Sequence, residues 1–228
     1  MNKQFFNIKF ILYLIFLSLD MIFFDFHHHK RHNSYGIYNL QSGEILPEKY
    51  FSIGIHPKDI DENWQKNFEI LKKQSSQKNC VAIGECGLDS LVSVGENLQK
   101  EIFGAQILWA NEIQKPVIIH CVKRFQELIP FQKIAKIPLI IHGFNKKKSV
   151  ADEMLKHGFY LSFGKSVLHN LSLQIIIRDF PIEKMFLETD NKDFDIAELY
   201  QKVAEIKEIS LEKLQNQVSK NLENVLFK

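Results

Sequence analysis

The stretch Val117-Ile118-Ile119-His120 shows the pattern that decides the fold of this chain, a short apolar run that ends in a histidine. Comparable runs along the chain end at other polar side chains: His27 and His29, Glu85, His142, and Asp190. An apolar run of about four to six residues between polar turns is typical of a buried parallel strand. The carboxyl ends of such strands meet at one face of a barrel, so these side chains are expected to meet there.

Strands and helices alternate along the chain. The predicted strands cover residues 21–26, 37–40, 51–55, 81–85, 117–120, 139–142, 159–163 and 185–189. Amphipathic stretches of helical length cover residues 64–73, 98–113, 125–135, 150–157, 171–179, 196–209 and 211–226. A strand followed by a helix, repeated in this way, predicts an α/β fold with parallel strands, and together with the strand-end residues a TIM-like (β/α) barrel.

The alternation of strands and helices is interrupted in the N-terminal part of the chain. Between His29 and Ile37 there is no room for a crossover helix, since a parallel crossover needs about a dozen residues or more. We therefore expect residues 37–40 to form a short hairpin-like arm. The barrel then has about seven good parallel strands and an irregular front part.

Composition narrows the class of protein. A chain of 228 residues that is 45% hydrophobic can bury the core of a single domain, which we place at residues 21–228. A net charge of +2 is too small for a protein that coats nucleic acid, so any nucleic acid is expected as a substrate held in a cleft. The three cysteines, with no CxxC spacing, fit a reducing compartment and predict a cytoplasmic location.

The N-terminal residues resemble a signal peptide in part. Lys3 and Lys9 precede an apolar run at residues 10–19. The run is shorter than the roughly 20 residues that span a bilayer, and no small-residue cleavage pattern follows it. We interpret residues 1–20 as the product of a start codon called too early, ahead of a strand that begins at Met21. A real signal or membrane anchor and a helix packed on the barrel are the alternatives.

The polar strand ends carry the residue types of a metal site. Alternate residues of a strand point to one face, so His27 and His29 project together while His28 turns away. A buried charge at a strand end must be paired or coordinated. The candidate metal ligands are His27, His29, Glu85, His120, His142 and Asp190. Six ligands exceed the needs of one ion, which predicts two divalent ions (Mg²⁺, Mn²⁺ or Zn²⁺) about 3.5–4 Å apart that activate water for hydrolysis.

The ordered set of segments resembles the TatD family of metal-dependent deoxyribonucleases, among the amidohydrolase-like barrels. The resemblance covers nearly everything from Met21 onward, in the segments at residues 25–29, 54–57, 84–89, 116–121, 141–144 and 187–190. It implies that His27, His29, Glu85 and Asp190 hold one ion and that Glu85, His120 and His142 hold the other. It also implies that Asp190, with Glu85, is catalytic, that Asp190 is the general base, and that the reaction is exonucleolytic cleavage of phosphodiester bonds.

Three segments depart from the family pattern. Val122 stands where the family usually has an arginine, Gly143-Phe144-Asn145-Lys146 replaces Cys-Phe-Ser-Gly, and the proline expected after Asp190 is missing from Asn191-Lys192-Asp193. These segments face the substrate, so hydrolase is a safer prediction than DNase. The alternative is a small-molecule amidohydrolase or esterase, although its usual bridging lysine at a strand end is missing. A non-catalytic binding module is the third reading.

Four further residues are candidate substrate contacts. His56 closes a strand, Phe144 can stack on a base, and Lys146 and Lys147 follow the strand that ends at His142, where they can reach a phosphate. The alternatives are a strand cap for His56, lid packing for Phe144, and a solvated surface for the lysines. No stable protein partner is expected, and no membrane contact unless residues 1–20 are an anchor.

Overall fold

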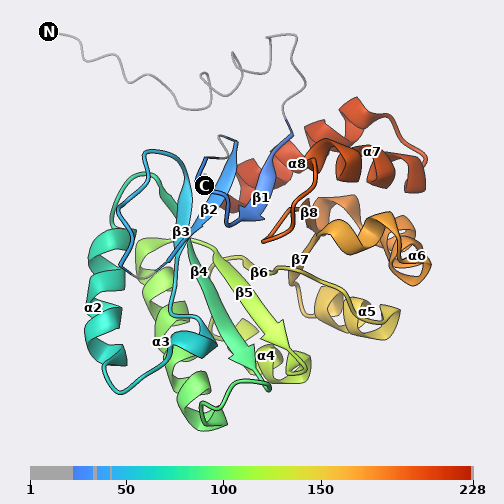
Figure 1. The fold of residues 1–228 in the computed structure, drawn as a ribbon. Coiled ribbons are helices and arrows are strands. Elements are labelled where there is room, and N and C mark those ends of the chain that lie inside the picture. Colours follow the sequence, from blue (N-terminus) through green and yellow to red (C-terminus); the bar gives the residue numbers. More distant parts are fainter. Residues whose placement is uncertain (1–22, 33–34, 42, 227–228) are drawn as a thin grey trace, which may run out of the picture.

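The computed structural model describes residues 23–32, 35–41 and 43–226, and in this part of the chain the strands form a single parallel sheet (Figure 1). Each strand pairs in parallel with the next one along the chain. The strands are β1 (Asp25–His28), β2 (Gly36–Leu40), β3 (Phe51–Ile53), β4 (Cys80–Asp89), β5 (Val117–Val122), β6 (Leu139–Ile141), β7 (Tyr160–Phe163) and β8 (Met185–Leu187). The expectation for residues 1–20 lies outside the described residues.

The sheet curls round until its first and last strands meet. His28 and Asp190 form a parallel bridge, in which the Asp190 N–H donates to the His27 carbonyl at 2.9 Å and the His29 N–H donates to the Asp190 carbonyl at 3.2 Å. Eight parallel strands in a nearly closed ring confirm the predicted TIM-like barrel.

Helices cover the outside of this ring. They are α2 (Trp64–Ser75), α3 (Glu96–Ile113), α4 (Phe125–Gln132), α5 (Lys148–Lys156), α6 (Leu171–Asp179), α7 (Ile196–Ile206) and α8 (Leu211–Leu226), with 3₁₀ turns η1 (Pro57–Asp59), η2 (Lys165–Leu168) and η3 (Ile182–Lys184). In Figure 1, α2 and α3 lie to the left of the strands and α5, α6 and α7 to the right. None of the helices in the described residues combines the length and the apolar character needed to cross a membrane.

Side-chain caps define where two of these helices begin. The Asn170 side chain accepts a hydrogen bond from the Leu173 N–H at 3.2 Å, at the start of α6. The Asp195 side chain accepts from the Ala197 N–H at 2.9 Å, at the start of α7. Each cap satisfies a backbone donor that the helix itself leaves unpaired, which is worth about 1 kcal/mol. Both helices therefore start directly after the loops that border the carboxyl ends of β7 and β8.

Residues 37–40 form a strand as predicted, but the expectation that they form a hairpin-like arm was wrong. They belong to β2, which pairs in parallel with both β1 and β3 and is buried along its whole length. β1 and β2 have only four and five residues, so the chain must travel back only about 10 Å between them, at roughly 3.3 Å per residue. A short connection without a helix covers this distance.

The core lies between the strands and the helices. Aromatic side chains fill much of it: the Phe26 ring stacks on Phe186 with ring centroids 4.1 Å apart, and the buried Tyr200 of α7 donates a hydrogen bond to the Phe24 carbonyl at 2.9 Å. Full burial of such a side chain contributes about 1.5–3 kcal/mol. These contacts hold β1 against β8 and α7, and so set the position of the residues that follow each strand.

Candidate metal centre

The carboxylate of Glu85 lies at the centre of a cluster of histidines at the carboxyl end of the barrel. Its Oε1 is 2.9 Å from His142 Nε2, 3.0 Å from His120 Nδ1 and 3.6 Å from His56 Nε2. Its Oε2 is 3.7 Å from the Nε2 atoms of both His27 and His29. Glu85 was expected at the end of its strand, but β4 continues to Asp89.

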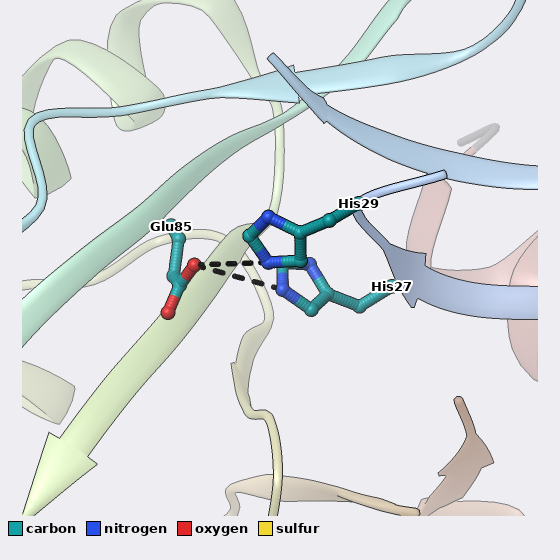
Figure 2. Close-up of side chains that lie close together, drawn as sticks. All are labelled: His27, His29 and Glu85. Carbon is teal, nitrogen blue, oxygen red and sulfur yellow. Dashed lines mark ion pairs between the residues drawn. The ribbon is translucent and has the colours of Figure 1, made fainter. Parts of the chain in front are cut away.

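His27, in β1, and His29, directly after β1, approach Glu85 from the same side, as Figure 2 shows. Their rings are perpendicular and 5.3 Å apart, whereas His28 points toward Tyr38. This arrangement follows from strand alternation. Burial lowers the pKa of His28 to about 4, so this side chain stays neutral within the protein.

Asp190, three residues after the end of β8, closes the cluster. Its Oδ1 lies 3.4 Å from His29 Nε2 and 4.0 Å from His27 Nε2, and its side chain is 28% exposed. The backbone at Asp190 is left-handed, with φ of 52°, a conformation that aspartate tolerates better than most residues. Burial favours the neutral acid, but the hydrogen bond with His29 and the charges of His142 and His27 outweigh it and lower the pKa of Asp190.

Glu85 and His142 stabilise each other's charged forms. Burial alone would raise the pKa of the Glu85 carboxyl, but His142, His120 and His27 together hold that pKa well below its ordinary value. Burial would lower the pKa of His142, and the Glu85 charge reverses this and raises it. A buried carboxylate surrounded by imidazoles is therefore anionic, which is the form that binds a cation.

His27 provides a direct test of whether these residues suit a metal. Both of its ring nitrogens are buried and have no hydrogen-bond partner among the described residues. Leaving such a group buried and unpaired costs about 1–3 kcal/mol, which coordination of an ion would offset. Imidazole and carboxylate groups together are ligands that divalent metals accept. The residues present therefore fit divalent ions.

Three overlapping groups of side chains in the described residues can each hold an ion. They are His27, His29 and Glu85; His27, His142 and Asp190; and His56, Glu85 and His120. In each group the ligand atoms lie within 4.8 Å of one another. The structure thus brings together all six predicted ligands and adds His56, which was expected to contact substrate. His56 Nδ1 also accepts a hydrogen bond from the Lys58 N–H at 3.0 Å.

Three polar residues that contact the cluster were not among the site residues predicted from the sequence. Asn39 Nδ2 donates to Glu85 Oε2 at 2.9 Å, and Asp89 Oδ2 lies 3.0 Å from His120 Nε2. Glu188 Oε1 accepts from the Gly143 N–H at 2.6 Å and lies 3.4 Å from His142 Nδ1. In the sequence, Asn39 and Glu188 are polar residues within or directly after apolar runs, and this pattern could have identified them as site residues. Both side chains are buried in the structure.

Of the other expected substrate contacts, Phe144 is buried and the two lysines are exposed. The Phe144 ring is 1% exposed and packs edge-on against Phe125 and Phe163, with centroids 6.0 and 5.7 Å away. The stacking role expected of Phe144 is corrected accordingly: the ring fills the core beneath the β6–α5 loop. Lys146 and Lys147 are exposed just before α5.

Comparison with known proteins gives one family. A sequence profile described as "TatD related DNase" matches residues 37–227. The chain is 28% identical over 191 residues to the uncharacterized metal-dependent hydrolase YabD of Bacillus subtilis (strain 168), covering 75% of each chain. It is 30% identical over 167 residues to the "3'-5' ssDNA/RNA exonuclease TatD" of Citrobacter rodentium (strain ICC168), covering 68% of this chain and 63% of that relative.

Solved structures share the fold. The chain superposes on the crystal structure of YjjV, a TatD homolog from Escherichia coli K12, with a TM-score of 0.73 at 17% identity, over 90% of this chain and 97% of that one. A TatD family hydrolase from Entamoeba histolytica gives the same TM-score and identity, over 90% and 98%. At this level of identity the likeness concerns the barrel itself.

Proposed function

The chain belongs to the TatD-related DNase family, and from this premise we propose that it is a metal-dependent phosphodiesterase that cleaves nucleic acid. In this proposal two divalent ions bind at the barrel mouth. His27, His29, Glu85 and Asp190 hold one ion, and Glu85, His120 and His142 hold the other. Glu85 is the shared ligand. Mg²⁺, Mn²⁺ and Zn²⁺ are the candidate ions, since all accept carboxylate ligands and the last two also accept imidazole.

The observation that carries the proposal is the position of Glu85. One buried carboxylate lies within 3.7 Å of nitrogens from five histidines, with a different set of histidines near each of its oxygens. A carboxylate in this position can bridge two cations. Such a bridge is typical of two-metal sites that clamp both oxygens of a phosphoryl displacement.

The protein side chains have separate tasks. Bound divalent ions lower the pKa of a water molecule and neutralise charge that develops on the phosphate. Asp190 is the most exposed carboxylate among the proposed ligands, so we assign to it the acceptance of the proton from the attacking water. Asp89 and Glu188 lie against the far nitrogens of His120 and His142 and hold these rings in orientation.

The test is hydrolysis by protein loaded in turn with Mg²⁺, Mn²⁺ and Zn²⁺. The substrates are single-stranded DNA, single-stranded RNA and bis(4-nitrophenyl) phosphate, with an amide, an ester and a lactone as the competing class. We expect turnover of the phosphodiesters that a chelator abolishes. Metal-dependent hydrolysis of the amide, ester or lactone without phosphodiester cleavage would favour the amidohydrolase alternative instead.

A further inference from the structure

Two cavities open on opposite sides of the proposed metal centre. One has a volume of about 810 Å³ and lies between the loops after β6, β7 and β8; it reaches Asp190. We call it the β7–β8 cavity. The other has a volume of about 520 Å³, lies beside β2, β3 and α2, and reaches Glu85 and His56. We call it the β3–α2 cavity. The helices that flank the two cavities lie on the right and the left of Figure 1.

The two cavities differ in charge. The β7–β8 cavity is lined by the cations Lys165 and Lys192. Two carboxylates also line it: Glu188, which is fully buried, and the proposed ligand Asp190. The β3–α2 cavity has a single cation, Lys58. Besides the proposed ligand Glu85, this cavity has the carboxylates Asp59 and Asp61, with amide side chains around them. A phosphate is attracted to the first cavity and repelled from the second.

The lysines of the β7–β8 cavity are available to a ligand. Neither Lys165 nor Lys192 forms an ion pair with any described residue; the Lys165 ammonium donates to the Asp193 backbone carbonyl at 3.0 Å. The Asp193 carboxylate is instead paired with Lys30 at 3.0 Å. On the other side of the mouth, Arg124 already donates to Glu96 and Glu127. Lys165 and Lys192 therefore carry positive charge that the described residues leave unmatched.

The β7–β8 cavity also suits the rest of a nucleotide chain. Leu171, at the start of α6, is 74% exposed and gives an apolar surface for the face of a base. Asn145 and Ser166 bring an amide and a hydroxyl group that can bind sugar or phosphate oxygens. The β3–α2 cavity, with its carboxylates and amides, suits the hydroxyl and amino groups of a single nucleoside that carries no further phosphate.

We infer that the polynucleotide binds across the metal centre in a fixed orientation. The continuing strand occupies the β7–β8 cavity, with its phosphates against Lys165 and Lys192. The terminal nucleoside occupies the β3–α2 cavity. This inference rests on the proposed function, since it places the scissile phosphodiester between the two cavities. It assigns substrate contacts to the β7–α6 and β8–α7 loops, whereas the sequence suggested Lys146 and Lys147, which line neither cavity.

The experiment compares substrates of two lengths. A dinucleotide has one phosphodiester, which occupies the metal centre, whereas a single-stranded decamer adds phosphates that must lie in the β7–β8 cavity. We expect Lys165→Ala and Lys192→Ala each to lower kcat/KM on the decamer roughly fivefold more than on the dinucleotide, as loss of a phosphate contact. The slope of log(kcat/KM) against log[salt] on the decamer becomes shallower by about 0.7 per lysine removed.

Lys58→Ala is the matched control, because Lys58 lies in the opposite cavity and forms no ion pair with any described residue. It should leave the ratio of the two kcat/KM values unchanged, and Lys220→Ala on the exposed face of α8 should change neither value. A selective loss on the decamer in Lys58→Ala, or an equal loss on both lengths in the Lys165 and Lys192 variants, overturns the inference and leaves the proposed function standing. A wild-type protein that cleaves neither length removes the proposed function, and the inference with it.

Discussion

Asp25 and Thr189 join the first strand of the barrel to the last. Asp25 Oδ1 accepts a hydrogen bond from the Thr189 N–H at 2.8 Å, and Oδ2 accepts one from the Thr189 hydroxyl at 2.6 Å. The two residues are 164 positions apart in the chain and both are buried. Asp25 precedes His27 by two positions and Thr189 precedes Asp190 directly. The contact that closes the barrel thus also sets the spacing of two proposed metal ligands.

The first prediction concerns this contact. Asp25→Ala leaves the Thr189 N–H and hydroxyl buried without this acceptor, so we expect it to destabilise the fold by about 2–4 kcal/mol. Asp25→Asn keeps an acceptor for the N–H and should cost less than half of that. Thermal or urea unfolding of both variants measures the difference. Equal stability of Asp25→Ala and the wild type would show that the barrel closes without this pair.

The second prediction concerns the shared ligand. Glu85→Gln keeps the size of the side chain but removes the charge that can bridge two ions. We expect bound metal to fall from two ions per chain to one or none, and hydrolysis to fall by about two to four orders of magnitude. Elemental analysis after dialysis gives the metal content. The control is Glu69→Gln, an exposed glutamate on α2 whose partner is Lys72, and it should retain both metal and activity.

The third prediction concerns Asp190. Asp190→Asn removes the proposed proton acceptor, so we expect turnover to fall by about two to four orders of magnitude, while single-stranded DNA still binds. Rapid-quench kinetics and fluorescence anisotropy separate the two effects. Asp195→Asn is the matched control on the same loop, since asparagine also caps a helix and α7 should be preserved. Near-normal turnover in Asp190→Asn would exclude the assigned role.

The fourth prediction concerns removal of the metal. Because both nitrogens of the buried His27 have no hydrogen-bond partner in the described residues, the ion-free protein carries a cost that a bound ion offsets. We expect a chelator to lower Tm, and return of the ion at about a hundred times its Kd to restore roughly 2.7 kcal/mol of stability. His27→Gln should remove most of this shift, and His157→Gln, at a half-buried i,i+4 pair with Glu153 on α5, should not. A chelator-insensitive Tm in the wild type would argue against tight binding.

The fifth prediction concerns Glu188 as a positioning residue. Glu188→Gln still offers an oxygen at the position of Oε1, which faces both the Gly143 N–H and His142 Nδ1, but it removes the negative charge beside His142. We expect about 10- to 100-fold weaker metal binding with a Tm close to that of the wild type. Competition with a chromogenic chelator measures the affinity. The exposed Glu183→Gln is the control, and an unchanged affinity in Glu188→Gln would mean that His142 is oriented by Glu85 alone.

Much of the barrel could be predicted from local pattern. The helix at residues 171–179 and the helix at 211–226 have the bounds that the sequence predicted, and every predicted strand overlaps an observed one. The apolar runs around Ile83, Ile119 and Ile141 are buried because a parallel strand covered on both faces needs apolar residues throughout. The error at β2 came from assuming that a parallel connection must contain a helix, which holds only when the strands are long.

The sequence by itself indicated which polar side chains lie in or just after the carboxyl-terminal parts of the strands, and therefore that His27, His29, Glu85, His120, His142 and Asp190 meet at one face. This follows from strand alternation and from the shared edge of parallel strands, which are both local rules. The tertiary structure alone decided that Phe144 faces the core and that Glu188 contacts His142. It also decided that the β7–β8 cavity is lined by Lys165 and Lys192 and not by Lys146 and Lys147. These contacts depend on how loops that are far apart in the chain are brought together when β1 meets β8. No repeating pattern in the sequence predicts how close two such loops lie in the folded protein.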